Sequence, residues 1–529
     1  MKSDAKQILM RSKQAWEIKD LWKHIIEECY EYALAAVNPY EADKNQPRSM
    51  KRQYDSTAPN AAIRLANRLL NDLTPLHEDW ISLETGPVLD MQLDDTQKEQ
   101  VNKELNKASR IANLVVNQGE AVAARHAAYI DLVVSGMGVI LNLEDPNHLT
   151  NPVSSQAVSQ AEVAIEKDAR GQNSLISRKR KMKVRDLKGL WDDVDIPERV
   201  KSQTGKDKDP DIEVVEITYK NTNPKRRGSN EPDWYYQVLY VDGDTPSVMV
   251  DRGYNENPWT ILQWIVLPGC PYGPGPVMLA LGDIRVANKI VEMILQNAAL
   301  ALAGMYLVRD DGVVNPDNIQ ITQGGMIPVG STGGSVGASV VPLDTGRNFD
   351  VGQVVLEEYQ TRIKKWLYDN GLPVQSGNPR SATEIIERVR ELTQDLGAGI
   401  GRLTGDHVDY VRRIVGITTR AGIIPFDLQI DQFTLKIQIN SPLARAQQLQ
   451  KVETVVRWLQ TVIELGGEQT LAIVSKLPQI MVWIGAQMGV PPELVNTALE
   501  REQAETSLAQ IAAAGAMPDA PPAALPSQA

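Results

Sequence analysis

Hydrophobic residues are patterned most regularly in two stretches near the middle of the chain. The first, 277–303, is rich in Ala, Leu, Ile and Val, and it contains one residue that weakens helices, Gly282. Pro276 precedes it, at a first helical position, where proline is favoured. The pattern predicts a helix here, a rod of roughly 40 Å at about 1.5 Å per residue.

The second stretch, 349–371, also has helical periodicity. Its hydrophobic positions share one face: Val355, Tyr359, Ile363 and Trp366. Gly371 and then Pro373 follow, a combination typical of a helix C-terminus. Short apolar runs separated by glycines lie between the two stretches. We therefore predict two helices and a small strand-containing tip that project as one unit.

The first part of the chain predicts helices followed by a sheet. Residues 1–37 show a broad apolar face that includes Ile18, Leu21 and Ile25, and 121–139 is an alanine-rich helical pattern. Alternating runs between 211 and 266 predict a meandering antiparallel sheet. Residues 146–180 are polar and weakly patterned, which indicates a mobile insertion or an exposed helix.

A basic run, 178–185, follows that polar stretch. Clustered Lys and Arg are typical of a nucleic-acid patch, but they also occur on solvated edges that balance nearby acids. We favour the second interpretation.

The last part of the chain predicts mostly helix. A long helix begins near Ser381 or Thr383, and Gly397, Gly399 and Gly401 predict a kink in it, because each glycine weakens a helix by about 1 kcal/mol. Residues 433–440 alternate like a strand, and helix resumes at Pro442. The Pro-rich end, 514–529, predicts a disordered tail.

Composition narrows the class of protein. The chain has 529 residues, enough for several cores, and a formal net charge of -12, so no basic field attracts nucleic acid as a whole. Its two cysteines, Cys29 and Cys270, are far apart, which suggests no disulfide framework and fits a reducing cytoplasm. The N-terminus lacks the apolar core of a secretory signal.

No pattern for catalysis, metal or cofactor binding stands out. The glycine-rich segment 330–337 lacks the lysine of a phosphate-binding loop, and the five histidines are isolated. Residues 290–308 are apolar enough to suggest a membrane-spanning helix. Glu292 would be costly in a membrane, so we favour a helix that packs against protein. We predict no enzyme, no metal site and no cofactor.

Four short motifs occur in order along residues 54–446. They are Tyr54-Asp-Ser-Thr57 with Leu73-Thr-Pro75 and Trp80-x-x-Leu83, Tyr272-Gly-x-Gly-Pro276 with Ala280-Leu-Gly-Asp283, Ala382-Thr-Glu384, and Ser441-Pro-Leu-Ala-Arg-Ala446. Each is weak alone, but together and in this order they resemble the portal, or head-to-tail connector, of short-tailed bacteriophages.

The resemblance implies an α+β fold, mainly helical, with a wing, a two-helix stem, a small clip and a helical crown. The implied boundaries are a wing at 1–271, stem helices at 272–304 and 349–371 around a clip at 305–348, a tunnel loop at 372–381, a long kinked helix returning to the wing at 382–440, a crown at 441–513 and a tail at 514–529.

The same resemblance implies a role in the virion. Portals form rings, usually of twelve subunits, at one capsid vertex, are assembled in the host cytoplasm, and let double-stranded DNA pass during packaging and ejection. The implied partners are terminase, a tail adaptor protein, the major capsid and scaffold proteins, and internal core proteins, with no membrane involved.

The resemblance also suggests which residues meet DNA. The candidates for cations in the channel are Arg380, Lys364, Lys365, Arg285 and Lys289, and those of the tunnel loop are Pro373, Gln375, Asn378 and Arg380. For each cation the alternative is a solvated or paired side chain. Three other classes of protein stay open: a motor ATPase, a membrane channel and a tail adaptor.

Overall fold

The computed structural model shows a mixed helix and sheet protein that divides into two compact units. The first unit is Met1–Asn71 with Asn117–Ile414, and the second is Asp72–Val116 with Val415–Ala529. The structure describes residues 4–36, 38–40, 53–76, 78–145, 151–203, 211–221, 231–243, 245–303, 306–309, 326–329, 340–342, 349–369, 382–424, 435–440, 442–475, 477–488 and 506–507.

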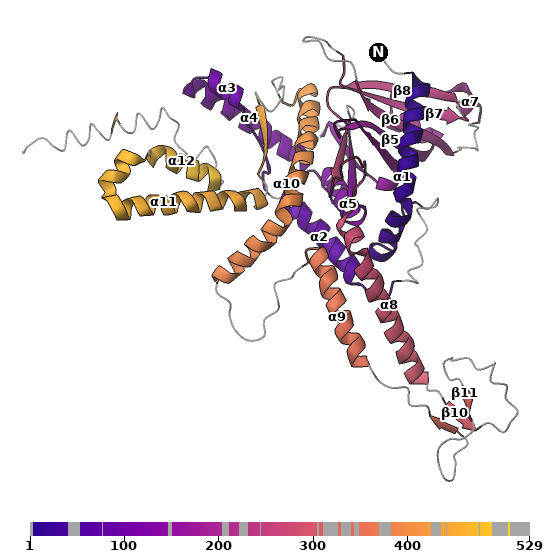
Figure 1. Cartoon of the computed structure of the whole chain (residues 1–529). Helices are drawn as coiled ribbons and strands as arrows, with labels where there is room; N and C mark the ends of the chain where they lie inside the picture. Colours follow the sequence, from indigo (N-terminus) through magenta and orange to yellow (C-terminus); the bar gives the residue numbers. More distant parts are fainter. Residues whose placement is uncertain are drawn as a thin grey trace, which may run out of the picture. The chain divides into compact units, whose positions relative to one another are not determined.

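Two antiparallel sheets form the body of the first unit (Figure 1). The larger has the order β4-β5-β6-β7-β8 and the smaller the order β3-β2-β9. Their strands are β2 (Met137–Glu144), β3 (Val153–Val158), β4 (Val163–Lys167), β5 (Asn173–Lys183), β6 (Asp211–Lys220), β7 (Trp234–Asp242), β8 (Thr245–Tyr254) and β9 (Trp259–Gln263).

The sheets correct two predictions. Residues 151–183 are neither a mobile insertion nor an exposed helix, because they form β3, β4 and β5, and Val163, Ile165 and Ile176 are fully buried. The meander between 211 and 266 is confirmed for three strands only, since β9 joins the smaller sheet. Local alternation identifies a strand, but it does not identify the sheet to which the strand belongs.

Helices cover these sheets. The helix α1 (Ala5–Ala33) packs through Ile8 and Ser12, and the Ser12 hydroxyl lies 2.7 Å from that of Ser177 on β5. The predicted apolar face of this segment was partly wrong, because Ile18 and Leu21 are exposed. The remaining elements around the sheets are α5 (Gly119–Ser135), η1 (Gln160–Glu162), α6 (Val184–Leu190) and α7 (Glu198–Gln203).

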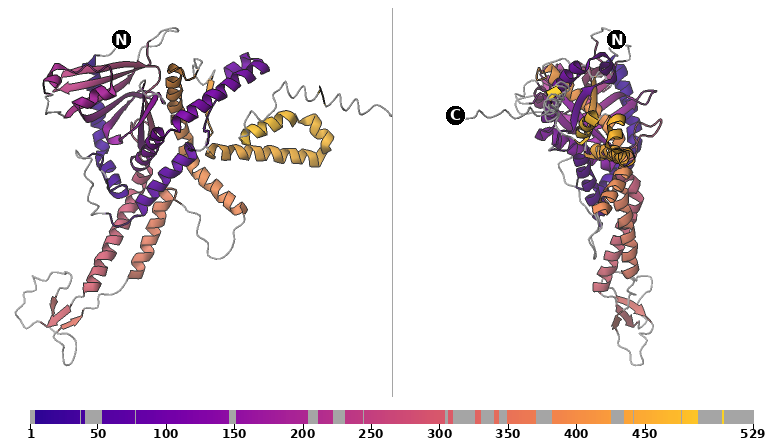
Figure 2. Two further views of the ribbon diagram at one scale, coloured as in Figure 1. Left: turned by 180° about the vertical axis from the view of Figure 1, so that it is seen from behind. Right: turned by 90° about the vertical axis from the view of Figure 1, so that its left-hand side faces the viewer.

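The two predicted central helices are present and lie side by side (Figure 2). They are α8 (Pro276–Ala303) and α9 (Phe349–Trp366). Between them in sequence, β10 (Tyr306–Arg309) pairs in parallel with β11 (Met326–Val329) and antiparallel with β12 (Val340–Pro342). The first unit also contains most of α2 (Thr57–Leu73) and α10 (Ala382–Arg420).

The second unit is built around a long-range strand pair. Here β1 (Ile81–Thr85) pairs antiparallel with β13 (Leu435–Ile439). The opposite edge of β1 is covered by α4 (Asp95–Val116), because Asn113 Oδ1 accepts the Ile81 N–H at 3.1 Å and Ser109 Oγ accepts the Leu83 N–H at 2.8 Å. The other helices are α3 (Pro87–Gln92), α11 (Pro442–Val474) and α12 (Leu477–Met488), and α11 is interrupted at Gly467, where φ is 73°.

Candidate functional site

The start of α8 is fixed by a close crossing of two backbone segments. Gly275 passes Gly136, at the end of α5, so closely that a Cβ on Gly275 would lie 2.5 Å from the Gly136 nitrogen. Tyr272 anchors the same segment, since its buried hydroxyl accepts the Ile165 N–H at 3.0 Å. The Tyr-Gly-x-Gly-Pro motif therefore sets where α8 leaves the sheets.

The α8–α9 pair has a buried side and an exposed apolar side. Ile284 and Ala287 of α8, with Ile363 of α9, are fully buried. Several large apolar side chains on the pair are nevertheless exposed: Leu279, Val286, Met293, Leu295, Leu302, Val354 and Trp366. Leu279, Val286 and Met293 recur every seven residues and so share one face of α8, a pattern typical of a surface that contacts protein.

The predicted cations on this pair differ in their partners. Arg285 forms a two-pronged ion pair with Glu28 of α1, and Lys289 pairs with Glu292 one turn along α8 at 2.9 Å. Lys364 and Lys365, in the last turn of α9, are exposed and make no ion pair with the residues that the structure describes. They are the most available of the described candidates.

The predicted tunnel loop lies outside the described residues. This applies to Pro373, Gln375, Asn378 and Arg380. The three glycines of the predicted kink, Gly397, Gly399 and Gly401, lie within the helix α10. The kink itself stays a prediction.

A buried polar cluster, which sequence reasoning missed, joins α10 to α5. His407 Nδ1 lies 2.6 Å from the Leu403 carbonyl and must donate to it, so Nε2 accepts the Tyr129 hydroxyl at 2.7 Å. Burial is the main reason that the pKa of His407 falls to about 4, and the nearby Arg125 also lowers it. The imidazole is therefore neutral at pH 7. Its isolation in sequence concealed the cluster, because Tyr129 lies on another helix.

Two further charged groups on α10 hold the sheets. The guanidinium of Arg413 is fully buried, donates to Glu256 at 3.2 Å and to the Asn142 carbonyl at 3.3 Å, and lies over the Tyr254 ring. Asp406 accepts the Gln263 N–H at 3.4 Å, and desolvation raises the pKa of this carboxyl to about 6. No sequence signal separates Arg413 from Arg412 beside it.

The favoured interpretation of the basic run 178–185 is only partly confirmed, because Arg178 and Arg180 pair with acids but are not solvated, whereas Lys181, Lys183 and Arg185 are exposed. Arg178 pairs with Glu162 at 2.9 Å, and Arg180 pairs with the fully buried Glu216 at 2.7 Å. On β5 Arg178 is buried and Arg180 is largely buried, and both are paired with acids rather than solvated, so they offer little surface to nucleic acid.

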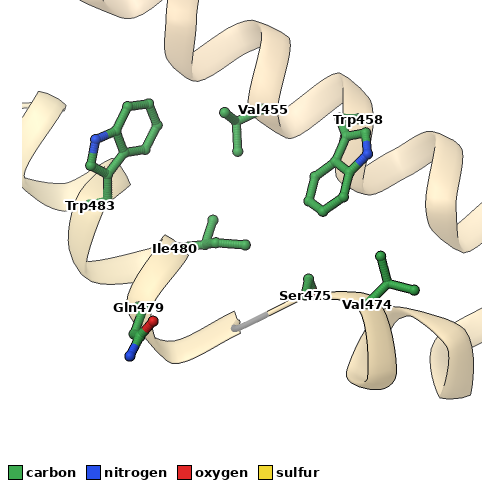
Figure 3. Close-up of a pocket in the computed structure, with 7 residues that line it drawn as sticks. All are labelled: Val455, Trp458, Val474, Ser475, Gln479, Ile480 and Trp483. Atoms are coloured by element: carbon green, nitrogen blue, oxygen red, sulfur yellow. The ribbon is translucent and has the colours of Figure 1, made fainter.

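An apolar hollow of ≈ 460 Å³ lies between α11 and α12 (Figure 3). Its lining residues are Val455, Trp458, Val474, Ser475, Gln479, Ile480 and Trp483. Among the described residues no titratable side chain lines it, so these residues offer no group for acid–base catalysis.

The described part of the chain contains no candidate metal site and no candidate membrane-spanning helix. Among those residues no group of three or more His, Cys, Asp or Glu is placed to hold a metal ion. Within the same residues no helix has the length and apolar character to cross a bilayer.

Comparison with known proteins supplies the family. Residues 5–495 match the model of the family described as bacteriophage head to tail connecting protein. The portal protein of Enterobacteria phage T3 is 20% identical over 502 residues, which cover 92% of this chain and 89% of that protein. The portal protein of Escherichia phage T7 is 23% identical over 376 residues (70% and 66%), and a probable portal protein of Bordetella phage BPP-1 is 22% identical over 485 (88% and 84%). The chain, with its pair of central helices and strand tip, therefore belongs to the bacteriophage head to tail connecting protein family.

Proposed function

We propose that this chain assembles into a closed ring, of twelve subunits by analogy with its family, that conducts double-stranded DNA. The exposed apolar surface of the α8–α9 pair carries this proposal, because a repeated side-to-side contact between copies would bury it. In this proposal α8 and α9 form the stem, and the tip with β10, β11 and β12 forms the clip.

Weak contact with DNA fits the charge of the chain. Each phosphate contact adds salt-dependent affinity, so a channel that must let DNA slide needs few cations. A formal net charge of -12 agrees with that need. We propose Lys364, Lys365 and Arg380 as the cations that face DNA, and we rank Arg285 and Lys289 lower because both are paired within the chain.

The proposed partners meet different parts of the chain. Terminase and later a tail adaptor would contact the clip, whereas the C-terminal helices would face the capsid interior, with its internal core proteins. The capsid and scaffold proteins would hold the ring at its vertex in the virion. The role is structural, without catalysis.

Electron microscopy of the purified protein tests the ring. End-on views should show a closed ring with a central hole wide enough for duplex DNA. A chain that stays monomeric even with its capsid and scaffold partners would contradict the proposal.

Charge removal tests the channel. Lys364→Ala with Lys365→Ala, and Arg380→Ala separately, should leave ring assembly intact and reduce the DNA retained in filled capsids. Arg362→Ala is the matched control, because Arg362 lies on the same helix but already pairs with Glu358. Normal DNA retention in the Lys364→Ala, Lys365→Ala double variant and in Arg380→Ala, as in the Arg362→Ala control, would exclude these three residues as cations that face DNA.

A further inference from the structure

The residues immediately before α2 contact both central helices through one small set of hydrogen bonds. Asn288 of α8 is buried, and its Oδ1 accepts the N–H groups of Tyr54 at 2.9 Å and Asp55 at 3.0 Å. The Asp55 carboxylate in turn accepts the Gln360 side-chain amide of α9 at 3.1 Å. Asn288, Asp55 and Gln360 thus form a continuous bridge from α8, through the segment that leads into α2, to α9.

Farther along α2, two arginines reach the C-terminal end of α9. Arg64 donates to the Asp369 carboxylate at 3.2 Å, and Arg68 donates to the Tyr368 carbonyl at 3.5 Å. Tyr368 has a φ of 54°, a left-handed conformation that is costly for a bulky residue and persists where the surroundings enforce it. Its ring lies against that of Trp264, with centroids 6.1 Å apart.

The two helices depend on these contacts to different degrees. The chain itself and the glycine crossing tie the start of α8 to the sheets. In the described structure α9 is held by its packing on α8, by the contacts from α2 and its preceding residues, and by the contact of the Tyr368 ring with Trp264 just after β9. Loss of the contacts from α2 would therefore loosen α9 more than α8.

We propose that α2 is a clamp that fixes the angle of α9 against α8 and the sheets, with Gln360 and Asn288 as its positioning residues. The role of the clamp rests on the proposed function, because force that passing DNA applies to the stem would be transmitted to the sheets through α2. Its geometry is testable without a ring or DNA.

Gln360→Glu tests the clamp with a change of one group. It replaces the amide donor with a second carboxylate facing Asp55, and two adjacent carboxylates repel when both are ionised. At pH 8 the repulsion should displace α9. At about pH 5 or below, one carboxyl takes up a proton, because a neighbouring like charge raises its pKa, and the hydrogen bond returns.

The distance between two spin labels measures the displacement. One label replaces Val354, which is exposed on α9, and the other replaces Arg170, which is exposed in the turn between β4 and β5. Cys270→Ser removes the half-buried thiol, whereas Cys29 is buried and stays unlabelled because burial raises its pKa to about 12. Labelled chain is diluted in unlabelled chain, so that only distances within one subunit contribute.

The expected result is one narrow distance for the parent, a broader or shifted distance for Gln360→Glu at pH 8, and recovery of the parent distance at acidic pH. Gln360→Leu should be broadened at both pH values. Gln353→Glu is the control, because it also creates a carboxylate pair, with Glu357, but within α9.

A narrow and unshifted distance for Gln360→Glu at pH 8 would overturn the clamp. Broadening in Gln353→Glu as well would do the same, since it would make the effect one of α9 alone. Neither result depends on ring formation, so the clamp and the proposed function fail separately.

Discussion

The pKa values of two adjacent residues on α10 shift in opposite directions: that of His407 falls and that of Asp406 rises. His407 is enclosed between Tyr129 and the Leu403 carbonyl, and burial favours its neutral form. Asp406 is partly desolvated, and its pKa rises although Arg402 and the Gln263 N–H favour the carboxylate. His407 therefore makes the free energy of unfolding sensitive to acid, whereas Asp406 lowers the free energy of unfolding at neutral pH.

For His407 we predict loss of stability in mild acid. Its folded pKa is about 4, below the ordinary 6.5, so its contribution is complete above pH 6.5 and is lost as the pH falls toward 4. The shift corresponds to at most about 3 kcal/mol. Asp406 changes the free energy of unfolding in the opposite direction over much of this pH range, so the test is the difference between variant and parent. On going from pH 7 to pH 4, His407→Gln should lose less stability than the parent, by up to about 3 kcal/mol, in denaturant titrations. An equal loss in variant and parent would place the sensitivity elsewhere.

For Asp406 we predict the opposite sign. Its folded pKa of about 6 exceeds the ordinary 3.8, so its ionisation costs stability above pH 6 and nothing near pH 4. Asp406→Asn should raise the free energy of unfolding at pH 8 by on the order of 1–3 kcal/mol, with the gain vanishing near pH 4. Thermal unfolding at the two pH values measures this. A variant that is less stable at pH 8 would show that the hydrogen bond to Gln263 outweighs desolvation.

At the scale of elements, α8 shows what its glycines do. Gly275 stands where two backbones cross, whereas Gly282 lies inside the helix with open space around it. Gly275 is required because there is no room for a Cβ at the crossing, whereas Gly282 only lowers helix propensity.

Alanine at these two positions should therefore have opposite effects. Gly275→Ala forces the crossing apart and should cost about 3 kcal/mol or more. Gly282→Ala should stabilise by up to about 1 kcal/mol through helix propensity. Thermal unfolding of both variants makes the comparison, and equal effects would contradict the crossing.

Local sequence patterns predicted helices and strands better than they predicted what these elements pack against. The alanine and leucine runs of 277–303 and the alternation of 435–439 gave correct elements, because both depend on near neighbours in sequence. The polar segment now seen as β3 to β5 was misread, since its buried face is completed by strands and by α1 far away in sequence. The clusters at His407 and Arg413 were missed for the same reason.

At the scale of the whole molecule, the exposed apolar side of α8 supports the proposed association between copies of the chain. Met293 is 51% exposed and shares one face of α8 with the exposed side chains of Leu279 and Val286. Association between copies is the event that would remove this surface from water.

A charge placed on this surface should therefore weaken association without unfolding the chain. Met293→Glu should shift sedimentation toward smaller species and change the free energy of unfolding of the single chain by less than about 0.5 kcal/mol. Gln296→Glu is the control, because it adds the same charge at an exposed polar position of α8. Equal sedimentation of Met293→Glu and the parent would exclude α8 from the subunit contact.

The pairing of β1 with β13 also imposes an order in time. Ile81 pairs with Ile439, so one strand leaves the ribosome long before its partner is synthesised. At about 5–20 residues per second, the wait is roughly 20–70 s. During it, Ser109 and Asn113 of α4 can already occupy one edge of β1, which leaves a single edge exposed. We therefore expect the unpaired edge of β1 to be a site where a second nascent chain can pair during this interval.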